Sequence, residues 1–386
     1  MDFSTRCIHH ASRVSNSTHP VVEPLYLTTA YAHTGERIAD MHLTNGYDYA
    51  RLQNPTREAL EDVVCSLEGG ADALAFSTGM AAIACLLELL KPGETLVTSW
   101  DLYGGTIRLF DAVTKKNGIK VVPVDTSDIA AVERALEGGA RLLFAETPTN
   151  PTMVVSDIAA LADAAHAAGA LLAIDNTFLT PYFQRPFEFG ADFVIHSATK
   201  YLAGHNDVLA GFLVVRDPDL AEQLRYLLKT IGSGLSAFDS WLVTRGLKTL
   251  PLRMEKHQEN AFAVARWLKE QDHVTYVYYP GLEEHPGHEL MRKQASGFGG
   301  MVTFGVDTKE LAFTVLENVK LILFAESLGG TESLITHPKL QTHVDVDPGE
   351  LAAKGIDECM LRISVGLESA DDLIADLEQA FSAKRL

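Results

Sequence analysis

Cysteine and positive charge are both scarce in this chain. Four cysteines (Cys7, Cys65, Cys85 and Cys359) occur in 386 residues without a Cys-x-x-Cys pair. That spacing argues against a disulfide framework and is typical of reduced thiols in a cytosolic protein. Acidic residues outnumber basic residues by 51 to 32, and no long run of one charge occurs. Nucleic acid is therefore not an expected partner, because it requires a basic face.

Long apolar runs are missing as well. The most apolar helix-like stretch, AAIACLLELL, is interrupted by Glu88, and no run reaches the roughly 18 residues that a membrane span needs. The first ten residues, MDFSTRCIHH, lack the apolar core of a signal peptide. We therefore expect no membrane partner and a cytoplasmic location.

Motifs for metals and nucleotides are absent or incomplete. The His9–His10 pair and His285-x-x-His288 have no acidic or thiol partner at ligand spacing, so no metal is expected. No Gly-Lys-Ser/Thr loop for nucleotides is present. The segment 232–237 fits Gly-x-Gly-x-x-Ala, but it follows a helical pattern where a strand is required, so it is predicted to be a loop.

Short apolar runs that alternate with helical periods fill the middle of the chain. Such runs are typical of strands that are covered on both faces of a mainly parallel sheet. The seven expected strands are residues 73–77, 95–99, 120–124, 141–146, 171–175, 192–197 and 211–215. The clearest helix covers 157–168, with Ser156 as the expected N-cap and Gly169 as the left-handed stop.

The two ends of the chain have other patterns. The first 60 residues are rich in turns and polar residues, and an extended arm is expected there. A long helical pattern begins at Trp241 and crosses Pro251. It leads to strands near 274–279, 300–306, 321–326 and 360–365 and to helices near 309–318 and 370–382. We expect an arm over 1–60, a large domain over 61–255 and a smaller α/β domain over 256–386.

Polar and aromatic residues follow five of the seven expected strands. Ligands of α/β proteins collect at the carboxyl ends of strands, so these residues should share one rim. They are Ser77, Gly79 and Met80 after the first strand, Tyr103 after the second, Asn150 after the fourth, Asp175 at the end of the fifth, and Ser197, Thr199 and Lys200 after the sixth.

One cofactor uses all of these chemical groups. Pyridoxal phosphate (PLP) needs a phosphate site, a carboxylate beside its ring nitrogen and an amine for its aldehyde. Gly79 opens a helix whose N–H groups suit an anion, Asp175 suits the ring nitrogen, and Lys200 suits the aldehyde. Ser197-x-x-Lys200 also matches the motif of penicillin-binding acyltransferases, but the Ser-Asp-Asn and Lys-Thr-Gly motifs of that group are absent.

The chain resembles the PLP enzymes of Cys/Met metabolism from about Val21 to the C-terminus. The resemblance rests on an ordered set of motifs: YDYARLQNPTR, STGMAA, DLYGGTIRLF, ETPTNP, DNTF, HSATKYLAGHND, RGLKTLPLRM, FAESLGG and LRISVGLE. It implies a fold-type I PLP-dependent transferase, with a seven-stranded mainly parallel sheet and a smaller C-terminal α/β domain. It also implies a homotetramer built from two dimers that share active sites.

The resemblance assigns a role to each matching position. Lys200 corresponds to the lysine that forms the Schiff base, Asp175 to the partner of the ring nitrogen and Tyr103 to the tyrosine stacked on the ring. The phosphate residues are Ser77, Gly79, Met80, Ser197 and Thr199, with Tyr49 and Arg51 reaching the phosphate of a neighbouring subunit. The substrate residues are Arg362 for the α-carboxylate, with Ser327 and Asn150 nearby, and Glu326, Arg108 and Asp48 for the distal end.

The family includes several activities, and the motifs are compatible with more than one of them. The leading expectation is γ-replacement on an O-acylhomoserine with cysteine, because family members with a glutamate at the position of Glu326 tend to be γ-synthases or γ-lyases. Cystathionine γ- or β-lyase and O-acetylhomoserine sulfhydrylase are the alternatives. A non-enzymatic assembly or regulatory member is disfavoured, because every expected catalytic position is filled.

Overall fold

A computed structural model describes residues 1–9, 19–33, 46–344 and 346–383 of the chain. The larger of its two sheets has the strand order β1-β7-β6-β5-β4-β2-β3. All seven expected strands are present, as β1 (Asp72–Phe76), β2 (Thr95–Ser99), β3 (Lys120–Val124), β4 (Ala140–Glu146), β5 (Leu171–Asp175), β6 (Phe193–His196) and β7 (Gly211–Val215). Only β7 runs antiparallel to its neighbours, β1 and β6. The prediction of a mainly parallel sheet is confirmed.

Helices cover both faces of this sheet, because the side chains of each strand alternate between two apolar cores. Leu172 and Ile174 of β5 pack in one core and Ala173 packs in the other. The first core is covered by α2 (Pro55–Glu68), α5 (Ile129–Leu136), α6 (Ile158–Ala167) and α9 (Ala237–Leu247). The second is covered by α3 (Gly79–Leu87) and α8 (Pro218–Ile231). Shorter elements complete the layer: α4 (Gly104–Leu109), a π-helix (Phe110–Thr114), α7 (Thr180–Phe183) and a 3-10 helix (Pro186–Phe189).

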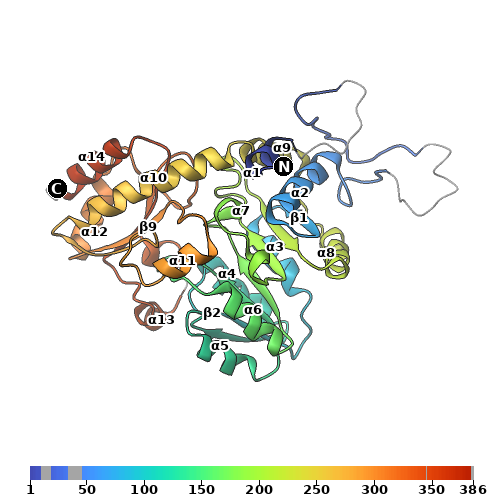
Figure 1. Ribbon diagram of the computed structural model, residues 1–386, viewed down its shortest axis with the longest axis horizontal. Coiled ribbons are helices and arrows are strands. Elements are labelled where there is room, and N and C mark those ends of the chain that lie inside the picture. Colours follow the sequence, from blue (N-terminus) through green and yellow to red (C-terminus); the bar gives the residue numbers. More distant parts are fainter. Residues whose placement is uncertain (10–18, 34–45, 345, 384–386) are drawn as a thin grey trace.

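The smaller sheet has the order β10-β11-β12-β9-β8 and lies at the other end of the molecule (Figure 1). Its strands are β8 (Val274–Tyr278), β9 (Met301–Val306), β10 (Leu323–Phe324), β11 (Leu334–Thr336) and β12 (Met360–Ser364). Its helices are α10 (Leu250–Lys269), α11 (His288–Gln294), α12 (Lys309–Asn318), a 3-10 helix (Pro338–Leu340), α13 (Pro348–Ala353) and α14 (Ala370–Phe381). The strand expected near 321–326 is only two residues long, and both of them are exposed. The short β11 was not predicted.

Two helix boundaries differ from the expected ones. Asp157, rather than Ser156, caps α6 by accepting the N–H of Ala160 at 3.0 Å. The hydroxyl of Ser156 instead shares a buried hydrogen bond with Thr126. The long helical pattern from Trp241 is two helices, α9 and α10, and Pro251 lies in the first turn of α10. A proline fits there because its missing N–H would have no helical acceptor.

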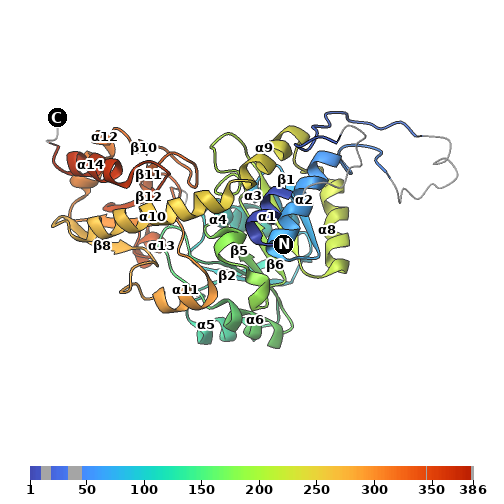
Figure 2. The ribbon, with the colours of Figure 1, turned by 45° about the horizontal axis from the view of Figure 1, so that its top comes forward.

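The helix α10 joins the two sheets (Figure 2). It packs against α14, β8 and β9 at one end and against α1 (Phe3–His9) and α7 near the other. The helix α1 is an addition to the expected extended arm, and it buries Cys7. The division of the chain at residues 60 and 255 stays a prediction, since α10 runs without a break through residue 255.

None of the helices in the described parts of the chain is long and apolar enough to cross a membrane. No disulfide joins the four cysteines. Across the described ranges, no group of three or more histidine, cysteine or acidic side chains is arranged to hold a metal ion. His10 of the His9–His10 pair lies outside those ranges.

Candidate active site

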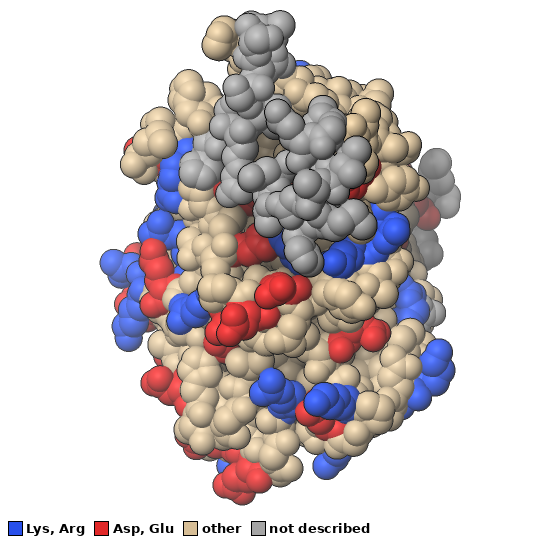
Figure 3. All heavy atoms as spheres, turned by 90° about the vertical axis from the view of Figure 1, so that its right-hand side faces the viewer, with Lys and Arg blue, Asp and Glu red and all other residues tan. Residues whose placement is uncertain are grey.

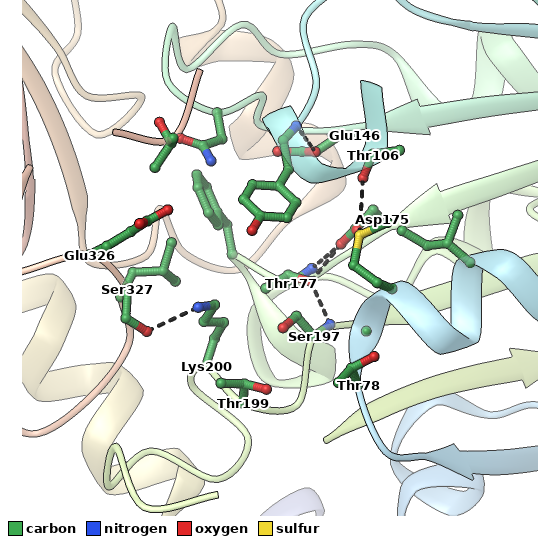
Figure 4. A pocket seen from close by; sticks show the side chains of 18 of the residues that line it. Thr78, Thr106, Glu146, Asp175, Thr177, Ser197, Thr199, Lys200, Glu326 and Ser327 are labelled. Carbon is green, nitrogen blue, oxygen red and sulfur yellow. Dashed lines mark hydrogen bonds between the residues drawn. The ribbon is translucent and has the colours of Figure 1, made fainter. Parts of the chain in front are cut away.

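A cavity of about 240 Å³ opens where the carboxyl ends of the β-strands of the large sheet face the small sheet. Eleven of the residues singled out in the sequence line it: Gly79, Met80, Tyr103, Asn150, Asp175, Ser197, Thr199, Lys200, Glu326, Ser327 and Arg362. They come from segments up to 283 positions apart (362 − 79), so the fold brings them together. The close view in Figure 4 shows several of them around one space.

Lys200 lies in the turn that follows β6 and is held by backbone geometry. Its N–H donates to the carbonyl of Ser197 at 3.1 Å, and its Nζ donates to Oγ of Ser327 at 2.9 Å (Figure 4). Burial lowers the pKa of the Lys200 ammonium to about 8, with a further contribution from the charge of Arg362 and an opposing one from Glu326. A larger share of this amine is therefore neutral near neutral pH than of an exposed lysine, which favours its action as a nucleophile and a base.

Asp175 ends β5 inside the cavity. Its Oδ1 accepts the N–H of Thr177 at 3.0 Å and the hydroxyl of Thr177 at 2.5 Å. The same hydroxyl accepts the N–H of Ser197 at 2.8 Å, so Thr177 ties the carboxylate to the segment that carries Lys200 (Figure 4). Burial raises the pKa of Asp175, while the bonds from Thr177 and the charge of His196 oppose that rise.

The first turn of α3 forms a cradle beside Ser197. Thr78 caps the helix by accepting the N–H of Ala81 at 3.0 Å, and the N–H groups of a first turn lack helical partners. A Cβ on Gly79 would meet Cα and Cβ of Ser197 at 3.0 Å, so a side chain there would narrow the cradle. The hydroxyl of Thr199 faces Ala210, because it donates to that carbonyl at 3.2 Å and accepts that N–H at 3.0 Å. Ser77 is exposed and does not line the cavity.

Arg362 enters the cavity from β12 of the small sheet. The side chain is 2% exposed, and its guanidinium donates to Oδ1 of Asn150 at 2.6 Å and to the carbonyl of Ser327 at 3.1 Å. Its Nε finds no acceptor among the described residues, so a donor remains for a ligand. Burial lowers the pKa of Arg362 to about 10, and the side chain still carries its charge at neutral pH.

Two residues occupy the more exposed part of the cavity wall. Tyr103 is 37% exposed, and burial of the rest of the side chain raises its pKa, with Glu326 adding to the rise. Glu326 is exposed, and no hydrogen bond or ion pair holds its carboxylate within the described residues. Its charge nevertheless acts on Tyr103, Lys200 and Arg362.

Glu146 and Thr177 are residues of the cavity that the sequence analysis did not single out. Glu146 ends β4 and pairs in register with Asp175 of β5. Its Oε2 accepts the N–H of Tyr103 at 3.1 Å. Burial and the neighbouring Asp175 raise the pKa of Glu146 well above its usual range. Both residues lie within quoted motifs, ETPTNP and DNTF, where their position at a strand end was the available signal.

Five predicted residues do not line the cavity of their own chain: Ser77, described above, and Tyr49, Arg51, Asp48 and Arg108. Tyr49 is 46% exposed, and the guanidinium of Arg51 lies 5.7 Å from the centre of its ring. Arg51 also donates to the carbonyl of Lys229 at the end of α8. Seen from the right-hand side of Figure 1, the surface of the molecule carries interspersed acidic and basic side chains (Figure 3).

The cavity fits PLP by the chemistry of its side chains. Asp175 offers a buried carboxylate to a ring nitrogen, Lys200 offers an amine with a lowered pKa to an aldehyde, and the first turn of α3 with Ser197 offers donors to a phosphate. Arg362 then has the position and the donors to hold the carboxylate of an amino acid.

Comparisons with known proteins agree with this chemistry. A family model described as Cys/Met metabolism PLP-dependent enzyme matches residues 4–382. The chain is 42% identical over 381 residues to a cystathionine β-lyase of Lactococcus lactis subsp. cremoris (strain MG1363), covering 98% of this chain and 99% of that protein. It is 45% identical over 376 residues to a cystathionine γ-synthase/O-acetylhomoserine (thiol)-lyase of Bacillus subtilis (strain 168), and this match covers 97% of this chain and 95% of that protein.

A solved structure shows the same similarity in three dimensions. The crystal structure of a cystathionine γ-lyase from Lactobacillus plantarum, complexed with L-serine, superposes with a TM-score of 0.94 at 40% identity. The match covers 99% of both chains. These three relatives have different activities at nearly equal identity, so similarity alone does not select one.

Proposed function

The chain belongs to the Cys/Met metabolism PLP-dependent enzymes, and on that premise we propose that it is a cystathionine γ-synthase. It is a PLP-dependent enzyme of the trans-sulfuration class, which includes γ-synthases and lyases. The proposed reaction joins an O-acylhomoserine to cysteine. The bond between Cγ and the ester oxygen breaks, the acyl group leaves as a carboxylate, and the cysteine sulfur bonds to Cγ as its thiol proton is lost.

The residues of the cavity divide this work among them. PLP, when bound, supplies an electron-withdrawing ring that stabilises negative charge on substrate carbons. Asp175 would hold the ring nitrogen, Tyr103 would pack against the ring, and Gly79, Met80, Ser197 and Thr199 would hold the phosphate. Arg362 binds the substrate α-carboxylate with a planar guanidinium that Asn150 and Ser327 keep in place.

Lys200 moves protons. Its Nζ has a pKa lowered to about 8 by burial, so near neutral pH it exists in both protonation states in useful amounts. The neutral amine can take a proton from the α-carbon of the substrate, and the ammonium can return one to a neighbouring carbon. Ser327, at 2.9 Å from Nζ, positions the amine for both transfers.

Glu326 is the single observation that favours cysteine as the second substrate. Its carboxylate lines the exposed part of the cavity with no partner in the described chain. Free cysteine carries an ammonium that such a carboxylate can bind, whereas sulfide carries none and methionine has no distal charge. Glu326 therefore favours cysteine over sulfide, but a γ-lyase would carry a glutamate at the same position, so the substrate panel below has to separate synthase from lyase.

Assembly is part of the proposal. We propose a homotetramer of two dimers, in which Tyr49 and Arg51 reach the phosphate in a neighbouring subunit and Asp48 and Arg108 contribute to the distal end of the substrate. The exposure of Tyr49 and Arg51 supports this arrangement. The cytoplasm is the proposed compartment, because no disulfide joins the four cysteines.

A substrate panel tests the assignment. Purified enzyme is given O-acetylhomoserine or O-succinylhomoserine with cysteine, the same esters with sulfide, and cystathionine alone, and the products are quantified. We expect cystathionine to form from ester and cysteine faster than cystathionine is cleaved. Release of a 2-oxo acid from cystathionine as the main reaction would show that the enzyme is a lyase.

A further inference from the structure

One face of α10 carries three buried polar side chains that line no part of the cavity. Arg253, His257 and Asn260 are 4%, 0% and 0% exposed. Their spacing of four and three residues places them on one side of the helix. Buried polar groups are costly unless they are hydrogen-bonded, and all three of these donate to backbone carbonyls in the segments that follow Lys200 and Arg362. We call these three residues the polar face of α10.

Arg253 holds the segment that follows Lys200. Its Nη1 donates to the carbonyl of Tyr201 at 2.6 Å, and its Nη2 donates to Leu202 at 3.3 Å. The same Nη2 donates to the carbonyl of Gly246 at 2.9 Å. The segment fits closely around the guanidinium, since a Cβ on Gly204 would lie 2.0 Å from Nη1. Bonds to a charged donor are about twice as strong as neutral ones, so this contact fixes the Lys200 turn firmly.

His257 and Asn260 hold the segment that follows Arg362. His257 donates from Nδ1 to the carbonyl of Val365 at 2.7 Å, and burial lowers its pKa to about 4, so the ring is neutral with its proton on Nδ1. Asn260 donates to the carbonyls of Gly366 at 2.9 Å and Glu368 at 2.7 Å. The His257 ring also contacts the ring of Tyr201 edge-on, at 5.1 Å between centroids.

The two segments belong to different sheets. Lys200 follows β6 of the large sheet and Arg362 lies on β12 of the small sheet. Inside the cavity they meet through one residue of a loop, Ser327, which binds Nζ of Lys200 and the guanidinium of Arg362. A displacement of about 1 Å between reacting groups can cost roughly 100-fold in rate. The spacing of these two cations therefore needs a rigid support, and α10 spans the gap (Figure 2).

We propose that the polar face of α10 is a positioning element that sets the distance between Lys200 and Arg362. The inference rests on the proposed roles of those two residues but not on which thiol the enzyme uses. Arg253, His257 and Asn260 are positioning residues, because they touch neither the cavity nor a substrate. Weakening the hydrogen bonds at either end of the polar face should increase the mobility of both segments, because one helix carries all three side chains.

The test uses cofactor-free full-length protein and three variants. Arg253→Lys weakens the hydrogen bonds to the segment after Lys200, and Asn260→Ala removes hydrogen bonds to the segment after Arg362. Gln258→Ala is the matched control, because Gln258 lies on the same helix but forms its hydrogen bond with the N–H of Phe298 rather than with either segment. Amide hydrogen exchange is followed at Ala203 and Gly204, which donate to Ala198 and Lys200, and at Val365 and Leu367, which donate to Gly300 and Thr331. The rate at which an amine-selective acylating reagent labels Lys200 is measured by peptide mass spectrometry across pH 6–10.

The proposal is supported if a substitution that weakens one end of the polar face changes the amide exchange at the other end. Asn260→Ala should speed exchange at Ala203 and Gly204 and change Lys200 labelling, and Arg253→Lys should speed exchange at Val365 and Leu367. Each change should be roughly threefold to tenfold, the range for substitutions that act through an intervening element. Gln258→Ala should leave all four amides unchanged.

Effects confined to the substituted end would overturn the proposal. Should Arg253→Lys fail to fold, Asn260→Ala alone decides the matter through Ala203, Gly204 and Lys200 labelling. In the PLP-loaded enzyme, both variants should raise KM for the amino-acid substrate and lower kcat together. Because exchange and labelling need no turnover, their outcome does not depend on whether the enzyme is a synthase or a lyase.

Discussion

The residues proposed to bind PLP fall into two regions that differ in how the chain holds them. At the rim of the large sheet, Asp175 and Lys200 are packed into the cavity by hydrogen bonds from their own chain. On the N-terminal segment, Tyr49 and Arg51 lie at the surface and line no part of that cavity. On the proposed assignment, the chain builds most of the site and leaves one part of it exposed. A second copy of the chain is the partner that the proposal assigns to the exposed part.

Substitutions in the buried region should cause the largest losses of activity. Lys200→Ala removes the amine that is proposed both to hold the cofactor and to move protons, so we expect kcat to fall by about 10⁴-fold or more. Borohydride reduction followed by peptide mapping should place the reduced cofactor on Lys200 in the wild-type enzyme. Recovery of the adduct on another lysine would contradict the assignment of Lys200 as the lysine that binds PLP.

Arg362→Leu tests the part of the buried region that comes from the small sheet. Loss of a guanidinium with two charged hydrogen bonds to a carboxylate should raise KM by roughly 100-fold or more, since each such bond contributes about 1.5–3 kcal/mol. The absorbance of bound PLP should be little changed, because Arg362 is assigned to the substrate. An unchanged KM would show that another cation binds the carboxylate.

The buried position of Lys200 also predicts a dependence of stability on pH. Its folded-state pKa is lowered to about 8 from 10.5, so between these values the unfolded chain binds more protons and stability rises with pH. Below pH 8 the full cost of a buried charge is present. Lys200→Met should therefore raise the free energy of unfolding of the cofactor-free protein by about 3 kcal/mol at pH 7.

That gain from Lys200→Met should shrink as the pH rises through 8 toward 10. Urea unfolding at pH 7, 8 and 9.5 measures the trend, and Lys229→Met on the exposed end of α8 is the control. A gain that stays constant with pH would mean that the Lys200 amine is not desolvated.

The exposed Glu326 should have a smaller and more selective effect. Glu326→Ala should weaken the use of cysteine relative to sulfide by about tenfold in kcat/KM, the value of one partly solvated charged contact. Competition between the two thiols for one O-acylhomoserine measures the ratio directly. An unchanged ratio would remove the observation that favours cysteine.

The site at the carboxyl ends of the large sheet could be predicted from the sequence, because most of its strands are apolar runs that are followed by a polar residue. Asp175 and Lys200 follow that rule directly. Glu146 follows it too, but its importance depends on the pairing of β4 with β5, which places it beside Asp175. Strand order within a sheet leaves no local signal in the residues, so this contact could be read only from the structure.

The contribution of the small sheet was harder to predict. Arg362 and Ser327 were identified through the resemblance to a family, because no periodicity indicates that β12 faces the rim of another sheet. The polar face of α10 was missed, although the quoted motif RGLKTLPLRM contains Arg253; His257 and Asn260 lie beyond the end of that motif. Its meaning depends on loops that are up to 108 residues away in sequence.

Subunit mixing tests most directly whether the two regions meet in neighbouring subunits. Arg51→Ala chains and Lys200→Ala chains are each expected to be nearly inactive. In a mixed dimer, one site receives Lys200 from the first chain and Arg51 from the second. After verified exchange of equal amounts, we predict recovery of about a quarter of the wild-type activity, because half of randomly formed dimers are mixed and each has one intact site. No recovery after verified exchange, or full activity in a monomer, would contradict the account.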